Sequence, residues 1–379
     1  MTATSSDHES ERADETMRWT TGNRLSPMVH GMQDAPLRIL HLMGPLRPSG
    51  MERMLVSAAP YWPAHTAHVV VGQGDDHPFA PELEAAGYEL DTIPSIRVRA
   101  GVDALRRAVA NHRADVVHIH TEGAYINAVR GSRDASAIVR TIHNVFPVTG
   151  KASWSRRAQA LLGDRRVEAL VAPSPDVASQ ERALGRECEV VYNWVADDFS
   201  DVADVQSPTR HAVIVGNMSP IKNHVLALEA LVGSGIPLAL VGDTSGASPR
   251  EQELLAQLDR DGLLLHCGPG DPIPWLSGAG VYLMPSRHEG MGVALAEALT
   301  VGVPCVISDV PGLRWAADLV GVTSLPLDVR RWRQALTLAL AQGRTHDRAH
   351  PDFSASRGAR EYAGVYARVV GGARSAASA

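Results

Sequence analysis

The 379-residue sequence predicts an α/β protein with two doubly wound, parallel-sheet domains in tandem. Three observations support this prediction. Short apolar segments alternate with helical segments, which is typical of parallel sheets covered by helices on both faces. The alternation stops once, over the polar residues 197–210, and then begins again. The length also exceeds what one hydrophobic core usually organises.

The first half of the chain, residues 36–203, is expected to form one parallel sheet. Its expected strands are the apolar segments 37–43, 65–73, 89–94, 114–120, 137–144, 169–174 and 189–195. Helical spacing of apolar residues predicts helices over 51–62, 79–88, 102–113 and 152–166. Because such strands lack a polar face, both faces of the sheet should be covered.

The second half, residues 208–350, repeats the same pattern. Its expected strands are 211–217, 237–243, 263–268, 281–286 and 304–309. Its expected helices are 223–235, 248–262, 273–280, 292–302 and 332–344. A last amphipathic helix follows at 354–371, and the polar stretch 197–210 is the expected linker.

Composition excludes several classes of protein. Hydrophobic residues make up 45% of the chain and charged residues 21%, as in soluble globular proteins, and the formal charge of −6 argues against a nucleic-acid partner. Cys188, Cys267 and Cys305 are odd in number and far apart, so we expect reduced thiols in a cytoplasmic protein. No apolar run reaches the length of a membrane span, and residues 1–35 read as a disordered extension rather than a signal peptide.

Loops that follow the strands are the expected ligand site, because doubly wound sheets bind ligands at the carboxyl ends of their strands. The segment SRHEGMG, residues 286–292, is one of them. The backbone of Gly290 and Gly292 permits close approach, and the free N–H groups of the next helix suit a diphosphate. Glu289 in the loop and Glu297 within the helix would accept hydrogen bonds from hydroxyl groups. The alternative is one surface glutamate and one helix-capping glutamate.

The order of several motifs resembles the retaining glycosyltransferases of the GT-B fold, and more narrowly family 4. The resemblance covers residues 37–371 and rests on GMER, HIH, TIHN, VGNMSPIKN, HCGPGD and PSRHEGMGVALAEALTVGVPCV. It implies two Rossmann-like domains facing across a cleft. The domain of residues 36–203 would bind the acceptor and that of 208–350 the nucleotide sugar, and helix 354–371 would cross back to the first domain.

The resemblance also implies roles for charged residues. Glu289 would contact the donor sugar and Glu297 the nucleotide ribose, as the two glutamates of the E-x7-E motif do. Lys222 matches the lysine of the family's phosphate loop and would offset the charge of the leaving diphosphate. Taken alone, Lys222 would be a solvated lysine at a helix start.

One position departs from the family's pattern, because Asn217 stands where an arginine is common. Either Asn217 hydrogen-bonds the phosphate, or another cation substitutes. Arg287 and Arg47 lie on loops that could face the same cleft, and Arg47 is also placed on the acceptor side.

Other expected donor contacts are backbone and loop positions: Gly50, Gly268, Ile273, Met291 and Val293. Gly50 ends the first loop just before a helix. The region from Gly268 to Ile273 would hold the base, and Met291 would shape the pocket for the sugar.

Histidines follow two strands of the first domain. His118 and His120 flank Ile119, and we expect them to point to opposite faces of the sheet, so that only one faces the ligand. The resemblance selects His120, beside the donor sugar and the reacting centre. His143 would shape the acceptor side. The alternative for each is a satisfied core or turn histidine.

No metal or other cofactor is expected. The nearest acidic motif, GDD at residues 74–76, lies in a polar loop with no evident partner, and Lys222 with the helix dipoles would take over the role of a metal. The basic segments 97–113 and 154–166 would at most touch a membrane surface, and solvated helix faces are the simpler interpretation.

The sequence therefore predicts a retaining glycosyltransferase that moves a sugar from a nucleotide diphosphate to a hydroxyl of a small soluble or glycan acceptor. UDP is the expected nucleotide only because it is the most frequent one in such donors. The alternatives are another activity on the same fold, such as a pseudo-glycosyltransferase, phosphorylase or sugar-nucleotide epimerase, or a non-catalytic nucleotide-sugar-binding subunit. Sugar, acceptor and oligomeric state are left open.

Overall fold

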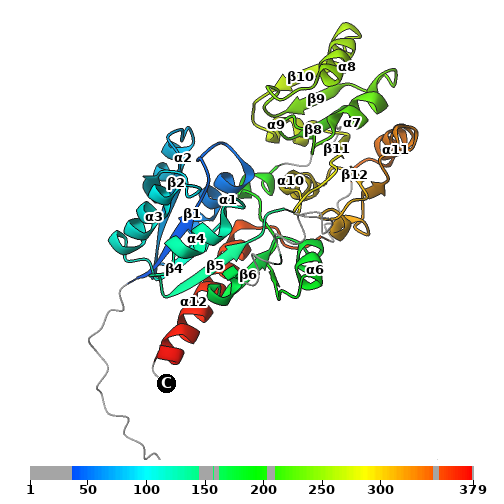
Figure 1. Ribbon diagram of the computed structural model, residues 1–379. Helices are drawn as coiled ribbons and strands as arrows, with labels where there is room; N and C mark the ends of the chain where they lie inside the picture. Colours follow the sequence, from blue (N-terminus) through cyan, green and yellow to red (C-terminus); the bar gives the residue numbers. More distant parts are fainter. Residues whose placement is uncertain (1–35, 145–156, 158–161, 203–209, 345–349, 378–379) are drawn as a thin grey trace, which may run out of the picture. The chain divides into compact units, whose positions relative to one another are not determined.

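A computed structural model describes residues 36–144, 157, 162–202, 210–344 and 350–377. The expected disordered extension 1–35 and most of the expected helix 152–166 lie outside these residues. Within them the chain forms two parallel β-sheets with helices on both faces, one of seven strands and one of six (Figure 1). The prediction of two doubly wound α/β domains is confirmed.

The first sheet has the strand order β3-β2-β1-β4-β5-β6-β7, and its strands pair in parallel. Its strands are β1 Leu37–Leu42, β2 Thr66–Gln73, β3 Glu89–Ile93, β4 Val116–Ile119, β5 Ala137–Thr141, β6 Ala169–Ala172 and β7 Glu189–Val190. β1 and β4 are neighbours, with His41 opposite His118. The strand order reverses at this pair, because β2 and β3 lie on one side of β1 and the later strands on the other. Doubly wound sheets bind ligands at such a switch point.

Helices cover both faces of the first sheet. They are α1 Gly50–Ala58, η1 Ala59–Tyr61, α2 Ala80–Ala85, α3 Arg99–Asn111, α4 Tyr125–Gly131, η2 Asp164–Arg166 and α6 Pro175–Ala183. The short helix η3, Asp197–Phe199, follows β7, and its Phe199 packs in the core of the second sheet. Leu105 of α3 and Val129 of α4 pack in one cluster with Leu40 and Val117 of the sheet. Met54 of α1 belongs to a second cluster on the other face, with Ile39.

The C-terminal helix α12, Ala355–Ala377, packs on the first sheet although it follows the second in the sequence (Figure 1). Tyr362 and Tyr366 of this helix lie in the cluster with Ile39 and Val139. Gly358 permits the crossing, because a Cβ there would lie 2.2 Å from the ring of Trp194. The helix therefore covers the face of the first sheet that also carries α1.

The second sheet has the order β10-β9-β8-β11-β12-β13, also parallel. Its strands are β8 Ala212–Val215, β9 Leu238–Val241, β10 Leu264–Gly268, β11 Val281–Met284, β12 Cys305–Ser308 and β13 Val322–Leu325. Its helices are α7 His224–Leu231, α8 Pro249–Arg260, α9 Ile273–Gly278, α10 Val293–Val301, η4 Arg314–Ala316 and α11 Val329–Gln342. β8 and β11 form its switch point.

Four elements differ from the sequence-based expectation. Helices α4 and α6 and strand β13 were not predicted, although Ser174 and Pro175 carry the N-cap and first-turn pattern of α6. The expected strand 189–195 ends at Val190. Beyond it the chain turns towards α12: Trp194 donates from Nε1 to Met54 O, and Val195 N donates to Phe353 O.

Candidate functional site

Two loops at the switch point of the second sheet are joined by hydrogen bonds. We call residues 216–223, after β8, and residues 285–292, after β11, the switch-point loops. Asn223, at φ 52°, donates from Nδ2 to Pro285 O at 3.0 Å and accepts from Arg287 at 2.9 Å. Arg287 N donates to Ile221 O at 2.7 Å. These bonds fix the two loops against each other at the edge where a ligand is expected.

Lys222 and Glu289 meet across the switch-point loops. Lys222 Nζ lies 2.7 Å from Glu289 Oε1, and Ser286 Oγ donates to the same oxygen at 2.7 Å. The Lys222 side chain is 30% exposed and the Glu289 side chain 10%. The structure thus brings together two predicted site residues that lie 67 positions apart in the sequence. A half-buried ammonium held by a carboxylate is suited to an anionic ligand that carries hydroxyl groups.

The start of α10 adds a second electropositive group. Gly292 is its N-cap at φ 78°, no side chain caps the helix, and its first N–H groups have no intrahelical acceptor. Gly50, the first residue of α1, lies beside Val293: a Cβ on Gly50 would be 3.7 Å from Val293 Cγ2. Three predicted donor positions, Gly50, Gly292 and Val293, are therefore neighbours, and the starts of two helices meet there.

Glu297 lies one turn further along α10 and is half-buried. The pKa of Glu297 is raised to about 7, mainly by burial; Arg53 lowers this pKa and Asp271 contributes to raising it. The carboxyl therefore changes its charge within the physiological range.

The predicted substitutes for the missing arginine have partners elsewhere. Asn217 Oδ1 accepts from Asp243 N at 2.8 Å, which ties the loop after β8 to the end of β9. Arg47 Nη2 lies 2.8 Å from Asp76 Oδ2 of the GDD loop, on the exposed surface. Arg287 donates to Asn223, as described, and is exposed. Of the two candidate cations, Arg47 and Arg287, only Arg287 lies on a switch-point loop, where its backbone N–H donates to Ile221 O next to Lys222.

The loop of residues 286–292, which we call the glycine loop, also contacts the first domain. A Cβ on Gly290 would lie 1.9 Å from His143 O, and Gly290 O accepts from Ser174 Oγ at 2.6 Å. Met291 is buried, and Asn193 N donates to its sulfur at 3.1 Å. The predicted acceptor-side residue His143 therefore lies against the glycine loop, and the Met291 side chain packs in the core of the second domain.

The expected base-binding segment follows β10. Gly268 has φ 152°, with open space where a Cβ would stand. Ile273 begins α9, and its N–H donates to Asp271 Oδ1 at 3.0 Å. Both positions lie at the carboxyl edge of the second sheet.

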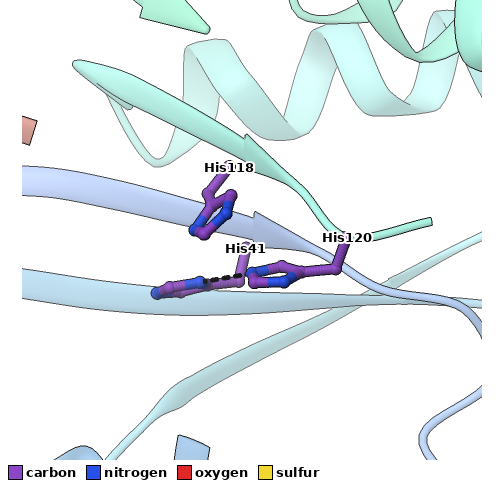
Figure 2. A group of neighbouring side chains, drawn as sticks. All are labelled: His41, His118 and His120. Atoms are coloured by element: carbon purple, nitrogen blue, oxygen red, sulfur yellow. Dashed lines mark hydrogen bonds between the residues drawn. The ribbon is translucent and has the colours of Figure 1, made fainter. Parts of the chain in front are cut away.

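The expectation that His118 and His120 point to opposite faces is wrong. Their ring centroids are 3.8 Å apart, because residues two apart in a strand share a face. His41 of β1 joins them, with Nδ1 at 3.1 Å from His120 Nε2 (Figure 2). All three side chains are buried, and burial lowers the pKa of each well below the usual range.

Two further histidines extend this cluster. His68 Nδ1 lies 3.0 Å from His41 Nε2, and His143 Nε2 lies 3.2 Å from His120 Nδ1. Sequence reasoning missed His41 and His68. Each is a polar residue within a mostly apolar strand, but the pairing of β1 with β2 that brings the two together is not visible in the sequence.

His118 is held separately by the C-terminal helix. Its Nδ1 lies 2.7 Å from Tyr366 Oη and its Nε2 lies 2.8 Å from Thr141 Oγ1. Each ring nitrogen of His41, His118 and His120 thus has a hydrogen-bond partner, although one nitrogen from each ring lies within 4.8 Å of the others and could converge on a metal ion. A metal would require these hydrogen bonds to break.

The fold and this site define the class of protein, and comparisons with known proteins agree. Residues 48–199 match the family described as Glycosyltransferase Family 4, and residues 209–342 match the family described as Glycosyl transferases group 1. The two parallel-sheet domains form a GT-B fold. The chain belongs to the group 1 glycosyltransferases.

Individual relatives agree with this assignment. EpsF of Bacillus subtilis, itself assigned provisionally to the glycosyltransferases, is 27% identical over 351 residues, which are 83% of this chain and 90% of EpsF. The O-antigen chain mannosyltransferase B of Escherichia coli is 29% identical over 130 residues, 31% of this chain and 34% of that protein. The solved structure of Anabaena Alr3699/HepE with UDP and glucose has a TM-score of 0.66 at 18% identity, covering 90% of this chain and 99% of that one.

No helix among the described residues is both long enough and apolar enough to cross a membrane.

Proposed function

We propose that the protein is a retaining glycosyltransferase that moves a sugar from a UDP-linked donor to a hydroxyl group of a small soluble acceptor. The observation that carries the proposal is the Lys222–Glu289 pair at the switch point of the second sheet, 2.7 Å apart, beside the uncapped start of α10. The pair combines a cation for a diphosphate with a carboxylate for sugar hydroxyls.

Each part of the donor has a matching group. The N–H groups at the start of α10 and the Lys222 ammonium suit the diphosphate. Glu289 suits the hydroxyl groups of the sugar, and Glu297, one turn along the same helix, suits the ribose diol. The solved relative Alr3699/HepE binds UDP and glucose, which supports UDP as the nucleotide.

The chemical step asks the protein mainly for electrostatic stabilisation. As the bond between the sugar and the phosphate breaks, negative charge grows on the diphosphate, and Lys222 with the α10 N–H groups offsets it. In the proposed front-side route the leaving phosphate takes the proton of the acceptor hydroxyl, so retention needs no covalent intermediate with a carboxylate of the protein. We propose that this stabilisation needs no metal ion, so EDTA should leave turnover unchanged.

Donor binding and turnover test the proposal. UDP-sugars at saturating concentration should raise the melting temperature, and the purified protein should release UDP when sugar acceptors are added. Glu289→Gln should lower kcat/KM on the order of 100-fold. The matched control is Glu253→Gln, which removes a carboxylate paired with Arg250 on the exposed surface of α8 and should leave turnover unchanged. A donor that binds and is isomerised, or is never turned over with any acceptor, would refute the transferase proposal.

A further inference from the structure

Four histidines cross the first sheet as one hydrogen-bonded chain. They are His68 of β2, His41 of β1, His120 after β4 and His143 after β5, one from each of four adjacent strands. The three histidine–histidine links measure 3.0, 3.1 and 3.2 Å. Figure 2 shows the middle link, with the His41 and His120 rings edge to edge. The chain ends at His143, whose backbone touches the glycine loop of the donor site.

At the His68 end of this histidine chain, the direction of the hydrogen bonds is fixed. His68 Nε2 lies 3.0 Å from Thr66 Oγ1, and Thr66 Oγ1 donates to Pro63 O at 2.7 Å. A carbonyl oxygen can only accept, so the one hydroxyl hydrogen of Thr66 lies between Oγ1 and Pro63 O. Thr66 Oγ1 must therefore accept from His68, which places a proton on His68 Nε2.

The remaining protons follow by counting. A neutral imidazole has one N–H donor and one acceptor nitrogen. With its proton on Nε2, His68 accepts at Nδ1 from His41 Nε2, and His41 in turn accepts at Nδ1 from His120 Nε2. His120 then accepts at Nδ1 from His143 Nε2. Four links use the four protons of four neutral rings, and none is left for His143 Nδ1.

Burial supports the neutral state on which the count depends. Burial lowers the pKa of His68 to about 3 and that of His143 to about 4. Burial also lowers the pKa of His41 and His120 well below the usual range, with neighbouring histidines contributing. His143 is half-buried, and its Nδ1 has no hydrogen-bond partner in the described part of the chain.

We propose that Pro63, Thr66 and these histidines form a one-way chain that keeps His143 Nδ1 unprotonated, so that it accepts a hydrogen bond from a hydroxyl group of the ligand beside the glycine loop. The nature of the ligand rests on the proposed glycosyl transfer, but the proton positions do not. Thr66 acts as a positioning residue, through three intervening histidines. A ligand group that can only accept hydrogen bonds is disfavoured at this point.

Nitrogen-15 NMR of histidine-labelled protein reads the proton positions directly, because protonated and bare imidazole nitrogens differ widely in chemical shift. At pH 7.5 the wild-type signal that disappears in His143→Gln should show a bare Nδ1 and a protonated Nε2. A wild-type His143 with its proton on Nδ1 overturns the proposal without any variant. Addition of one equivalent of Zn²⁺ should move none of these signals, and a joint shift of His41, His118 and His120 would overturn it in favour of a metal site.

Two variants at Thr66 test its role. Thr66→Val keeps the shape but removes the acceptor for His68, so the chain is free to reverse and His143 should gain a population with a proton on Nδ1. Loss of one ligand hydrogen bond should then lower kcat/KM for the acceptor about 5- to 10-fold. Thr66→Ser keeps the hydroxyl and should restore both readouts. An unchanged His143 signal in folded Thr66→Val would contradict the role of Thr66. If the histidine protons lie as proposed but the protein turns over no donor, the proposed function is refuted. The proposed direction of the histidine hydrogen bonds is not affected by that result.

Discussion

The chemistry of Lys222 and Glu289 depends on their contact with each other, and that contact joins residues far apart in the sequence. The chain has 36 lysines and arginines, yet lysine occurs only at positions 151 and 222. An ammonium is a compact, strongly hydrated charge, whereas a guanidinium is a planar fork, so the two are not interchangeable beside a carboxylate and a phosphate. The scarcity of lysine also makes Lys222 simple to follow by chemical labelling.

We expect a nucleotide sugar to shield Lys222 from an amine-directed reagent. With the donor at ten times its Kd, the free fraction sets the labelling rate, which should fall about tenfold at Lys222 and not at Lys151. Mass spectrometry of the digested protein measures the ratio of the two, so Lys151 is an internal reference. An unchanged ratio with bound donor would show that the diphosphate lies elsewhere.

Glu297 should make donor binding depend on pH. Its pKa of about 7 means that the carboxylate, the form that accepts two hydroxyl hydrogen bonds, becomes dominant as the pH rises from 6 to 8. The affinity for UDP-glucose, whose esterified diphosphate does not titrate in this range, should therefore increase over the same interval. Calorimetric titrations at pH 6, 7 and 8 measure it.

Glu297→Gln is the matched variant for this effect. The amide has the same shape and no titration, so its affinity should be lower at pH 8 and nearly constant between pH 6 and 8. A wild-type affinity that does not change with pH, or a variant that keeps the same dependence, would contradict the role of Glu297 at the ribose.

At the scale of elements, the glycine loop needs glycine at position 290 for close packing against the first domain, as well as for the approach of a ligand. A Cβ on Gly290 would lie 1.9 Å from the His143 carbonyl oxygen, which belongs to the backbone of the other domain. Gly290→Ala must therefore push the two segments apart. We expect a loss of about 1–3 kcal/mol in the free energy of unfolding, together with a lower kcat.

Gly364→Ala in α12 is the control for Gly290→Ala. It adds the same methyl group where nothing lies within 4 Å, in a helix in which alanine is favoured over glycine. Urea denaturation of both variants should show destabilisation at position 290 and a neutral or stabilising effect at position 364. Equal effects would mean that the glycine loop does not press on His143.

Elements were predictable from sequence where apolar periodicity was strong, and missed where it was weak or short. The buried strands β1, β2 and β4 and the helices α3 and α8 fall where alternation placed them. The short helix α4, seven residues long, has no sustained period, and β13 is only half-buried, so its apolar signal is weak. In the candidate site, sequence motifs were sufficient to find Lys222 and Glu289. The histidine cluster depends on strand pairing, so His41 and His68 became visible only with the register of β1, β2 and β4.

At the scale of the whole molecule, among the described residues, burial lowers the pKa of five histidines in the first domain: His41, His68, His118, His120 and His143. It also lowers the pKa of His211 and His224 in the second domain. Each has a folded-state pKa below the unfolded value of about 6.5. Above that value neither state binds the proton, and below it only the unfolded state does. Stability is therefore complete above about pH 6.5 and falls as the pH decreases towards the folded-state pKa values, about 4 for His143 and about 3 for His68.

We predict a steep loss of stability in mild acid. Each such histidine contributes up to about 1.4 kcal/mol per pH unit well below pH 6.5. Denaturation at pH 7.5, 6.5 and 5.5 should show little change in the first interval and a large loss in the second. His68→Gln should reduce the slope by about one proton, whereas His65→Gln, an exposed histidine three residues away, should not. A flat profile down to pH 5.5 would mean that the cluster takes up protons while folded.

The stereochemistry of transfer tests the central claim most directly. Time-resolved proton NMR of the purified protein with an α-linked UDP-sugar and an acceptor that it uses should show UDP release and a product whose first anomeric signal is α. Glu289→Gln should show neither on the same time scale. A β-linked first product, or a donor converted without transfer, would contradict the account of a retaining glycosyltransferase built on Lys222 and Glu289.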